Sequence, residues 1–365
     1  MILLNLMLYF CSMQTTSTEI KKKCIRSLSA EELKDFFVAS GEKAFRSRQV
    51  YEWLWKRSAR SFEQMTNLSK ETRTLLENNF SINPVTISQK QVSTDGTIKF
   101  GFKLHDGYLV EGVLIPADDR MTACISSQVG CSLTCKFCAT GYMDRKRNLE
   151  PYEIYDQVVL IKEAAEEHYQ TPLTNIVLMG MGEPLLNYTN VLKGIDKVTS
   201  EEGLHIASKR ITLSTAGIAK MITKLGDEKV KFRLALSLHA ANDVKRNTIM
   251  PINETNNLNV LKESLLHFCK ETGSSVTFEY IVFDGVNDTA QDAKELYAFA
   301  KNIPCKINII EYNPIQEADF MNTSVDKLEQ FKKVLTDKGI IVNIRRSRGK
   351  DIDAACGQLA IKEVK

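Results

Sequence analysis

The sequence lacks any apolar run long enough to span a membrane, which argues against an integral membrane protein. Its first residues, MILLNLMLYFCSM, are apolar but short, with no basic residue ahead of them and no convincing cleavage site. A weak secretory signal is one interpretation of this segment. We favour a start codon placed too early, or a disordered start, over residues 1–13, with Met13 as the candidate true start.

The cysteines also lack the pattern of a disulfide framework. There are nine of them in 365 residues, an odd number that is spread unevenly along the chain. Such thiols are typical of a reducing cytosol, where clustered cysteines more often bind metals or carry out redox chemistry. We therefore expect a cytoplasmic protein. Four of the nine are interpreted as structural or incidental: Cys11, Cys24, Cys269 and Cys305.

No strong net charge, internal repeat or low-complexity tract singles out a function. The formal net charge is +3, and the 43% hydrophobic and 25% charged residues are typical of a globular protein. Basic residues do cluster, most densely at Arg345, Arg346, Arg348 and Lys350. One such cluster is usually a solvated surface, but several of them beside a cysteine site favour a polyanionic substrate.

Residues 14–87 are predicted to form a helical domain. Ser29, followed three residues later by Glu32, is typical of a helix amino terminus. The only tryptophans, Trp53 and Trp55, lie beside basic residues in a segment with helical spacing. Aromatic and basic residues together could bind RNA, although two tryptophans in a small helical domain are more often core.

After residue 87 the pattern of apolar and polar residues changes twice. Residues 88–118 alternate apolar and polar side chains around Asp95-Gly96 and Asp106-Gly107, which predicts a β-hairpin segment. From residue 119 to 365, strands alternate with helical patterns, which predicts a parallel α/β barrel or open sheet. Functional residues gather where the strands of such folds end. These places read MGMGEP, LSTAG, SLHA, VNDT and YNP.

The most informative segment is CSLTCKFCATG, in which Cys131, Cys135 and Cys138 are spaced C-x₃-C-x₂-C. Three thiolates cannot close a tetrahedral zinc site alone, but Cys124 lies seven residues earlier and could be the fourth ligand. An iron–sulfur cluster bound by three cysteines instead leaves one iron open to another ligand. Both interpretations remain open from the spacing alone.

The longer strings CISSQVGCSLTCKFCATG, MGMGEPLLN and DIDAACGQLA resemble a family of the radical S-adenosylmethionine (SAM) superfamily. Its members are dual-specificity RNA methyltransferases that place a methyl group on C2 of adenine. The resemblance extends over nearly the whole chain. It implies an α/β fold, namely a partial (βα)6 radical SAM barrel over residues 119–365, with the amino-terminal helical domain and the small β-hairpin segment placed before it.

The resemblance also assigns cofactors. It implies that Cys131, Cys135 and Cys138 bind a [4Fe–4S] cluster, whose open iron holds the amino and carboxylate groups of SAM. The positions that match the family's SAM contacts are Gly182, Glu183, Ser214, Ser237, Leu238, His239 and Asn313.

Three further residues receive catalytic roles from the same resemblance. Cys356 would take a methyl group from one SAM, and a second SAM would generate the radical that activates this methyl for transfer to adenine. Cys124 would then release the product by forming a disulfide with Cys356, and Glu111 would be the proton acceptor. If AACGQLA begins a helix, its amino end and the nearby basic residues would lower the pKa of the Cys356 thiol.

The implied partners are 23S rRNA, tRNA carrying an adenine 3′ of the anticodon, and an electron donor such as flavodoxin or ferredoxin. We expect a monomer that participates in rRNA and tRNA processing. Two alternatives remain. One is the related enzyme that methylates C8 of the same rRNA adenine and confers antibiotic resistance. The other is a non-catalytic, zinc-stabilised RNA-binding protein in which Cys124 completes the zinc site.

Overall fold

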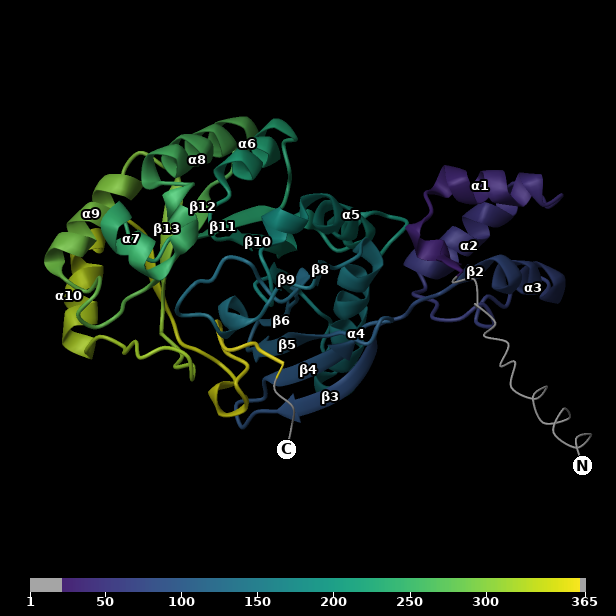
Figure 1. Cartoon of the computed structure of the whole chain (residues 1–365), viewed down its shortest axis with the longest axis horizontal. Coiled ribbons are helices and arrows are strands. Elements are labelled where there is room, and N and C mark those ends of the chain that lie inside the picture. Colours follow the sequence, from purple (N-terminus) through teal and green to yellow (C-terminus); the bar gives the residue numbers. More distant parts are fainter. Residues whose placement is uncertain (1–21, 362–365) are drawn as a thin grey trace, which may run out of the picture.

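A computed structural model of the chain describes residues 22–361 (Figure 1). The expectations for residues 1–13, including Met13 and Cys11, lie outside this range. Within it, none of the helices has both the length and the apolar composition needed to cross a membrane.

The amino-terminal region is helical, as predicted. Its first helix begins with the expected capping box: Ser29 Oγ accepts a hydrogen bond from the Glu32 N–H at 3.1 Å, and Glu32 Oε2 accepts one from the Ser29 N–H at 2.7 Å. Two short parallel strands join the two ends of the region. Its elements are β1 (Lys23–Cys24), α1 (Ala30–Ala39), α2 (Phe45–Trp55), α3 (Lys70–Asn79) and β2 (Phe80–Ser81).

These helices lie to one side of the larger α/β part, next to helix α4 (Pro151–Tyr169) (Figure 1). Trp55 is buried and packs edge-on against Tyr155 of α4, with ring centroids 5.2 Å apart. Arg26 forms a buried ion pair with Asp156 of the same helix, with Nη1 and Oδ1 2.5 Å apart. Trp55 is therefore a core residue that attaches the helical region to the barrel.

The Arg26–Asp156 pair predicts a large stability change. Replacing Arg26 with methionine leaves a buried carboxylate whose remaining hydrogen bond comes from the Val85 N–H at 2.9 Å. We expect the free energy of unfolding in urea to fall by about 3–5 kcal/mol. The control is Lys23→Met, which removes an exposed ion pair with Glu32 and should cost less than about 1 kcal/mol. Equal small losses in both variants would contradict the prediction.

The β-hairpin segment is an antiparallel meander. Both predicted turns form: Asp95-Gly96 joins β3 to β4, and Asp106-Gly107 joins β4 to β5. Gly96 and Gly107 have φ of +84° and +87°, a left-handed conformation that glycine adopts without steric cost. The strands are β3 (Thr86–Val92), β4 (Ile98–Lys103), β5 (Leu109–Ala117) and β6 (Arg120–Cys124).

From β6 onward the strands of the main sheet run parallel. The full order is β14-β13-β12-β11-β10-β9-β6-β5-β4-β3, so the meander extends the barrel sheet and the barrel stays open between β14 and β3. The remaining strands of this sheet are β9 (Asn175–Leu178), β10 (Ile211–Thr215), β11 (Arg233–Ser237), β12 (Val276–Ile281), β13 (Cys305–Ile310) and β14 (Val342–Arg345). A separate pair consists of β7 (Gln128–Val129) and β8 (Arg147–Asn148).

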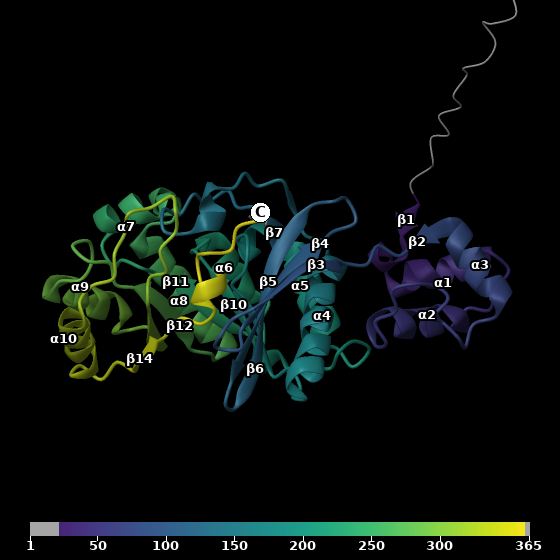
Figure 2. The same cartoon turned by 90° about the horizontal axis from the view of Figure 1, so that it is seen from below.

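Helices follow the parallel strands and return the chain to the next strand, which confirms the predicted α/β barrel. Helices α6, α8, α9 and α10 form an arc outside strands β10 to β13 (Figures 1 and 2). The remaining helices are α5 (Tyr188–Thr199), α6 (Ala219–Asp227), α7 (Asp243–Ile249), α8 (Leu258–Thr272), α9 (Ala290–Ala300) and α10 (Val325–Thr336).

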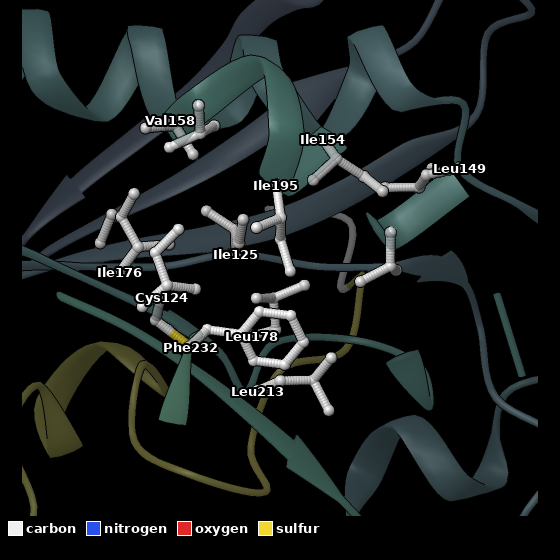
Figure 3. Close-up of a cluster of buried hydrophobic side chains, with 14 of the residues drawn as sticks. Cys124, Ile125, Leu149, Ile154, Val158, Ile176, Leu178, Ile195, Leu213 and Phe232 are labelled. Atoms are coloured by element: carbon white, nitrogen blue, oxygen red, sulfur yellow. The ribbon is translucent and has the colours of Figure 1, made fainter. Parts of the chain in front are cut away.

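The core fills the space between the sheet and the helices. Figure 3 shows part of it, in which Ile154 of α4 lies beside Ile195, and Cys124 of β6 lies beside Ile176 of the adjacent strand β9. Buried apolar side chains of this kind fix the strand positions. As a result the strand ends, which carry the polar motifs, are held in a constant arrangement.

Candidate active site

A cavity with an empty volume of about 910 Å³ lies at the carboxyl ends of the barrel strands. We call it the first cavity. Nine of the predicted site residues line it, from the cysteine loop, the strand ends and the last segment of the chain: Cys131, Cys135, Cys138, Gly182, Glu183, Ser214, Ser237, His239 and Cys356.

The three cysteines lie on a loop between β7 and β8. They are half-buried and pack against an apolar group that includes Phe137. Gly141 allows the loop to fold back on itself, because a Cβ there would lie 2.7 Å from the Cys135 carbonyl oxygen. The loop therefore presents three thiols to one cavity.

Burial raises the pKa of all three thiols, that of Cys131 to about 11. Their mutual repulsion as thiolates raises the pKa of Cys135 further, and the buried guanidinium of Arg246 opposes this rise. Three thiolates in one buried cavity would be stabilised by a cationic group bound among them. Soft thiolate donors in this number fit an iron–sulfur cluster.

The alternative zinc site finds no support in the geometry. A structural zinc requires all four ligand atoms at about 2.0–2.3 Å from one centre. Cys124 does not line the first cavity at all. It lies at the end of β6 and is buried against β5 and β9.

Glu183 is held by backbone donors from two strand ends. Its Oε2 accepts a hydrogen bond from the Ala216 N–H at 2.7 Å, and its Oε1 accepts one from the Leu185 N–H at 3.0 Å. Burial raises the pKa of its carboxyl group, and these bonds oppose that rise. Beside it, Gly182 has φ of +93°, and a Cβ there would lie 2.5 Å from the Gln128 Cβ. The glycine thus lets the turn pack closely under the carboxylate.

The tautomer of His239 follows from its surroundings. Its Nδ1 accepts a hydrogen bond from the Ile281 N–H at 3.1 Å. Burial, assisted by the Arg246 charge, lowers the pKa of the imidazole to about 3. The ring is therefore neutral at physiological pH and carries its proton on Nε2. His239 lines the first cavity, and its Nε2–H is a hydrogen-bond donor there.

The other predicted SAM contacts divide into two groups. Ser214 and Ser237 lie side by side on β10 and β11, with their Oγ atoms 3.5 Å apart. Leu238 and Asn313 do not line the first cavity. Leu238 is fully buried. Asn313 donates from Nδ2 to the Cys356 carbonyl oxygen at 3.0 Å, while its buried Oδ1 has no hydrogen-bond partner in the structure. This acceptor is unused and fits a ligand amino group.

The structure corrects the expectation for Cys356. No helix begins in AACGQLA within the described residues, because the chain turns at Cys356 and Gly357, and Gly357 has φ of +85°. The pKa of the thiol is raised rather than lowered, since the surrounding protein atoms desolvate the thiolate more than Arg345 stabilises it. The side chain is nevertheless accessible.

A second cavity, which shares Cys356 with the first, has an empty volume of about 540 Å³. Cys124, Cys356 and the basic residues Arg345, Arg346 and Arg348 line it. Burial raises the pKa of Cys124 to about 12, the Cys356 charge adds to the rise, and Arg345 opposes it. The two thiols are thus close enough to interact electrostatically. All eight cysteines among residues 22–361 are free thiols, so the disulfide expected between these two is not formed here.

Glu111 lies on β5 and lines neither cavity. It is buried and forms an ion pair with Lys99 of β4, whose Nζ is 3.0 Å from its Oε1. Lys99 also donates to the carbonyl oxygen of Asp353, three residues before Cys356. One lysine therefore joins the predicted proton acceptor, Glu111, to the stretch of chain just before Cys356.

Two charged residues of the site were missed by the sequence reasoning. Glu279 lines the first cavity, and its Oε2 lies 3.3 Å from Arg345 Nη1. Arg246 is fully buried and donates to the carbonyl oxygens of Ala216, Ser237 and Leu238 at the strand ends. A charged residue within an apolar strand was a usable signal for Glu279. Nothing in the sequence distinguishes Arg246 from other helical arginines.

Comparisons with known proteins agree with this arrangement. The family described as "Ribosomal RNA large subunit methyltransferase N-terminal domain" matches residues 25–82, and the "Radical SAM superfamily" matches residues 125–300. The chain is 55% identical to a protein of Flavobacterium johnsoniae over 94% of its length and 99% of that protein. It is 53% identical to a protein of Christiangramia forsetii over 97% of its own length and 99% of that protein. Both are named "Probable dual-specificity RNA methyltransferase RlmN".

A solved structure is similar over the same extent. The crystal structure of a radical SAM methyltransferase from Sphaerobacter thermophilus superimposes with a TM-score of 0.87. The two chains are 39% identical, and the match covers 92% of this chain and 99% of the other. Identity at this level over nearly the full length of both chains establishes common ancestry. The chain therefore belongs to the RlmN family and is a radical SAM RNA methyltransferase.

Proposed function

We propose that the chain methylates C2 of an adenine in 23S rRNA and of the adenine 3′ of the anticodon in tRNA, through a methylated Cys356. One observation carries the proposal: Cys356 lines both the cavity that holds the three cysteines and the cavity that holds Cys124. A thiol in this position can receive a group on one side and pass it on at the other. The zinc alternative gives Cys356 no role.

In this proposal Cys131, Cys135 and Cys138 hold a [4Fe–4S] cluster. SAM lies beside it, with Glu183, Ser214, Ser237 and His239 as polar contacts on the cavity wall. When bound, the cluster and SAM supply one-electron chemistry that removes a hydrogen atom from an otherwise inert methyl group, with electrons from a donor such as flavodoxin or ferredoxin. The neutral His239 donates from Nε2, and the carboxylate of Glu183 accepts.

The chain's own nucleophile makes the first transfer. The Cys356 thiolate attacks the methyl carbon of SAM, the carbon–sulfonium bond breaks, and S-adenosylhomocysteine leaves. Arg345 favours the thiolate, because its guanidinium opposes the pKa increase that burial causes. Asn313 fixes the Cys356 carbonyl oxygen during this step. The methyl carbon is then on a side chain that reaches the second cavity.

The last steps need a base and a second thiol. Once the carbon is bonded to adenine C2, the radical adduct has to lose one electron and the C2 proton to become a closed-shell aromatic ring again. The cluster, when bound, would supply the electron acceptor, and Glu111 is the candidate group to take the proton, directly or through Lys99. The Cys124 thiolate attacks the Cys356 sulfur, and the sulfur–carbon bond breaks. The carbon leaves with the electron pair, which the purine delocalises, and is protonated to a methyl group. The resulting disulfide is then reduced by a cellular thiol.

The second cavity is the proposed entry for the adenine. Three arginines line it beside the two thiols, and their charges suit a phosphate backbone. A base within a helix would have to be extruded to reach Cys356, whereas a loop base is already accessible. Residues 14–87 are the proposed RNA-binding domain. Trp53 is half-buried with Arg57 stacked 4.6 Å above its ring, and it is a better candidate for RNA contact than the buried Trp55.

The position of methylation can be tested with labelled rRNA and tRNA. Substrate with deuterium at adenine C2 should lose that deuterium in step with methylation, and substrate with deuterium at C8 should retain it. Mass spectrometry of the digested nucleosides measures both. Loss from C8 instead would establish the antibiotic-resistance activity.

We further propose that the enzyme acts as a monomer in the cytoplasm, a reducing compartment that suits its free thiols.

The cluster is tested separately by metal analysis. Protein purified without oxygen should be brown, with about four irons per chain. Replacing Cys135 with alanine should remove the colour and most of the iron. Cys305→Ala is a matched control, because Cys305 is also a half-buried free thiol but lines neither cavity. A colourless wild-type protein with one zinc per chain would overturn the proposed function.

A further inference from the structure

The turn between β3 and β4, residues 93–97, contacts the segment that carries Cys356. We call residues 347–359 the Cys356 segment. It follows β14, which is one edge of the main sheet, and it reaches the hairpin at the opposite edge, formed by β3 and β4. Figures 1 and 2 show this segment in yellow, close to the hairpin. It therefore crosses the open side of the barrel.

Asp95 makes the first contact. Its Oδ2 accepts a hydrogen bond from the Gly349 N–H at 2.9 Å, and its Oδ1 accepts one from the Thr97 N–H at 2.9 Å. Gly349 has φ of +66°, and a Cβ at this position would lie 2.9 Å from the Thr97 side chain. Because of this φ and the Thr97 and Ala354 side chains beside it, any other residue at position 349 would be strained.

Asp351 makes the reciprocal contact from the segment to the turn. Its Oδ1 accepts from the Ser93 hydroxyl at 2.5 Å, and its Oδ2 accepts from the Thr94 N–H at 3.0 Å. Lys99 Nζ adds a hydrogen bond to the Asp353 carbonyl oxygen at 3.1 Å. Asp95 thus bonds from the turn to the segment, Asp351 bonds from the segment to the turn, and Lys99 of β4 adds a third contact.

The segment is held again just after Cys356. The Ala139 N–H donates to the Gly357 carbonyl oxygen at 2.7 Å, and the Thr140 hydroxyl donates to the Leu359 carbonyl oxygen at 2.6 Å. Only Ala354 and Ala355 lie between the hairpin contacts and Cys356. Because Cys356 belongs to no helix or strand, these two groups of contacts, together with the Asn313 hydrogen bond to its carbonyl oxygen, hold the chain on both sides of its thiol.

We propose that Asp95 and Asp351 are positioning residues, which use the β3–β4 turn to hold the Cys356 thiol between the first and second cavities. The consequence for catalysis rests on the proposed function, whereas the contact itself does not. A reacting atom displaced by about 1 Å can slow a reaction 10²-fold. Releasing the segment should therefore slow methyl transfer to Cys356 without changing the cluster loop.

The first test is Asp95→Asn. The amide can accept only one of the two N–H groups that the carboxylate accepts, and its NH₂ group would face the other. Hydrogen exchange of the anaerobic holoprotein should become at least about tenfold faster in residues 347–359 and in the β3–β4 turn, where Asp95 also accepts from the Thr97 N–H, and stay unchanged elsewhere. Intact-mass analysis after incubation with SAM should show methylation of Cys356 slowed about 10- to 100-fold. The control Asp119→Asn, in the β5–β6 turn, should change neither rate.

A pair of substitutions at Asp351 separates positioning from general damage. Asp351→Ala removes both acceptors and should reproduce the Asp95→Asn result. Asp351→Asn can still accept from the Thr94 N–H and donate to the Ser93 hydroxyl, so it should restore most of the wild-type rate.

Unchanged exchange in Asp95→Asn would overturn the contact. Faster exchange with normal Cys356 methylation would overturn the positioning role. If wild-type Cys356 is never methylated, the proposed function fails, and the exchange result still decides the contact.

Discussion

Replacing Cys356 with alanine is expected to lower RNA methylation at least about 10³-fold, because the acceptor of the methyl group is lost. The first cavity should stay intact, since its walls come from the cysteine loop and the strand ends, apart from Cys356 and Gly357. Methylation is measured by transfer of a labelled methyl group from SAM to rRNA and tRNA. Iron content and SAM affinity should remain at wild-type values.

Cys305→Ala provides the comparison for this variant. The Cys305 thiol lies at the start of β13, 3.8 Å from the Ala300 carbonyl oxygen and away from both cavities. It should retain full activity. If Cys356→Ala also retains activity, the methyl group does not pass through this thiol. If instead it loses iron as well as activity, Cys356 supports the cluster loop through the contact between Ala139 and Gly357.

Replacing Cys124 with alanine is expected to trap a covalent adduct between the protein and its RNA. The reaction should proceed to the bond between the Cys356 methyl carbon and adenine, and then stop, because no second thiol can attack the Cys356 sulfur. Cys124 is the other thiol that lines the second cavity. The adduct is measured as a species of reduced mobility on a denaturing gel that ribonuclease converts to a discrete mass increase.

The double variant Cys124→Ala, Cys356→Ala is the control and should give no adduct. The single variant truncates a buried side chain, so its thermal unfolding is measured beside the wild type. An active, adduct-free Cys124→Ala protein would show that another group releases the product. An inactive, adduct-free protein with wild-type iron content would place Cys124 before the bond to RNA forms.

Opposing influences set the reactivity of both thiols. Burial raises the pKa of Cys124 and the Cys356 charge raises it further, while desolvation by the surrounding protein atoms raises the pKa of Cys356. Arg345 lowers both pKa values and is itself paired with Glu279 on the first cavity wall. The Arg345 guanidinium therefore pairs with a carboxylate of the first cavity and also lowers the pKa of both thiols that line the second cavity. Neither the Arg345–Glu279 pair nor its position between the cavities was predicted.

The sequence by itself determined the elements and the cysteine loop. Alternating apolar residues, helical spacing and Asp-Gly turns are local patterns, and the hairpins, the capped helix α1 and the parallel strands formed where these patterns predicted them. The spacing of Cys131, Cys135 and Cys138 placed three thiols in one cavity for the same reason, because a short loop brings neighbours together. Motif strings over the whole chain identified the family.

Only the tertiary structure decided where Cys356 lies and what surrounds it. The segment was predicted to begin a helix that lowers the pKa of the thiol, but it forms a turn and the pKa is raised. Its position depends on Asp95, Lys99 and Asn313, which are distant in sequence and meet it only because the last strand and the first hairpin flank the open side of one sheet. Burial and charge at a site are sums over all such neighbours, and no local pattern contains them.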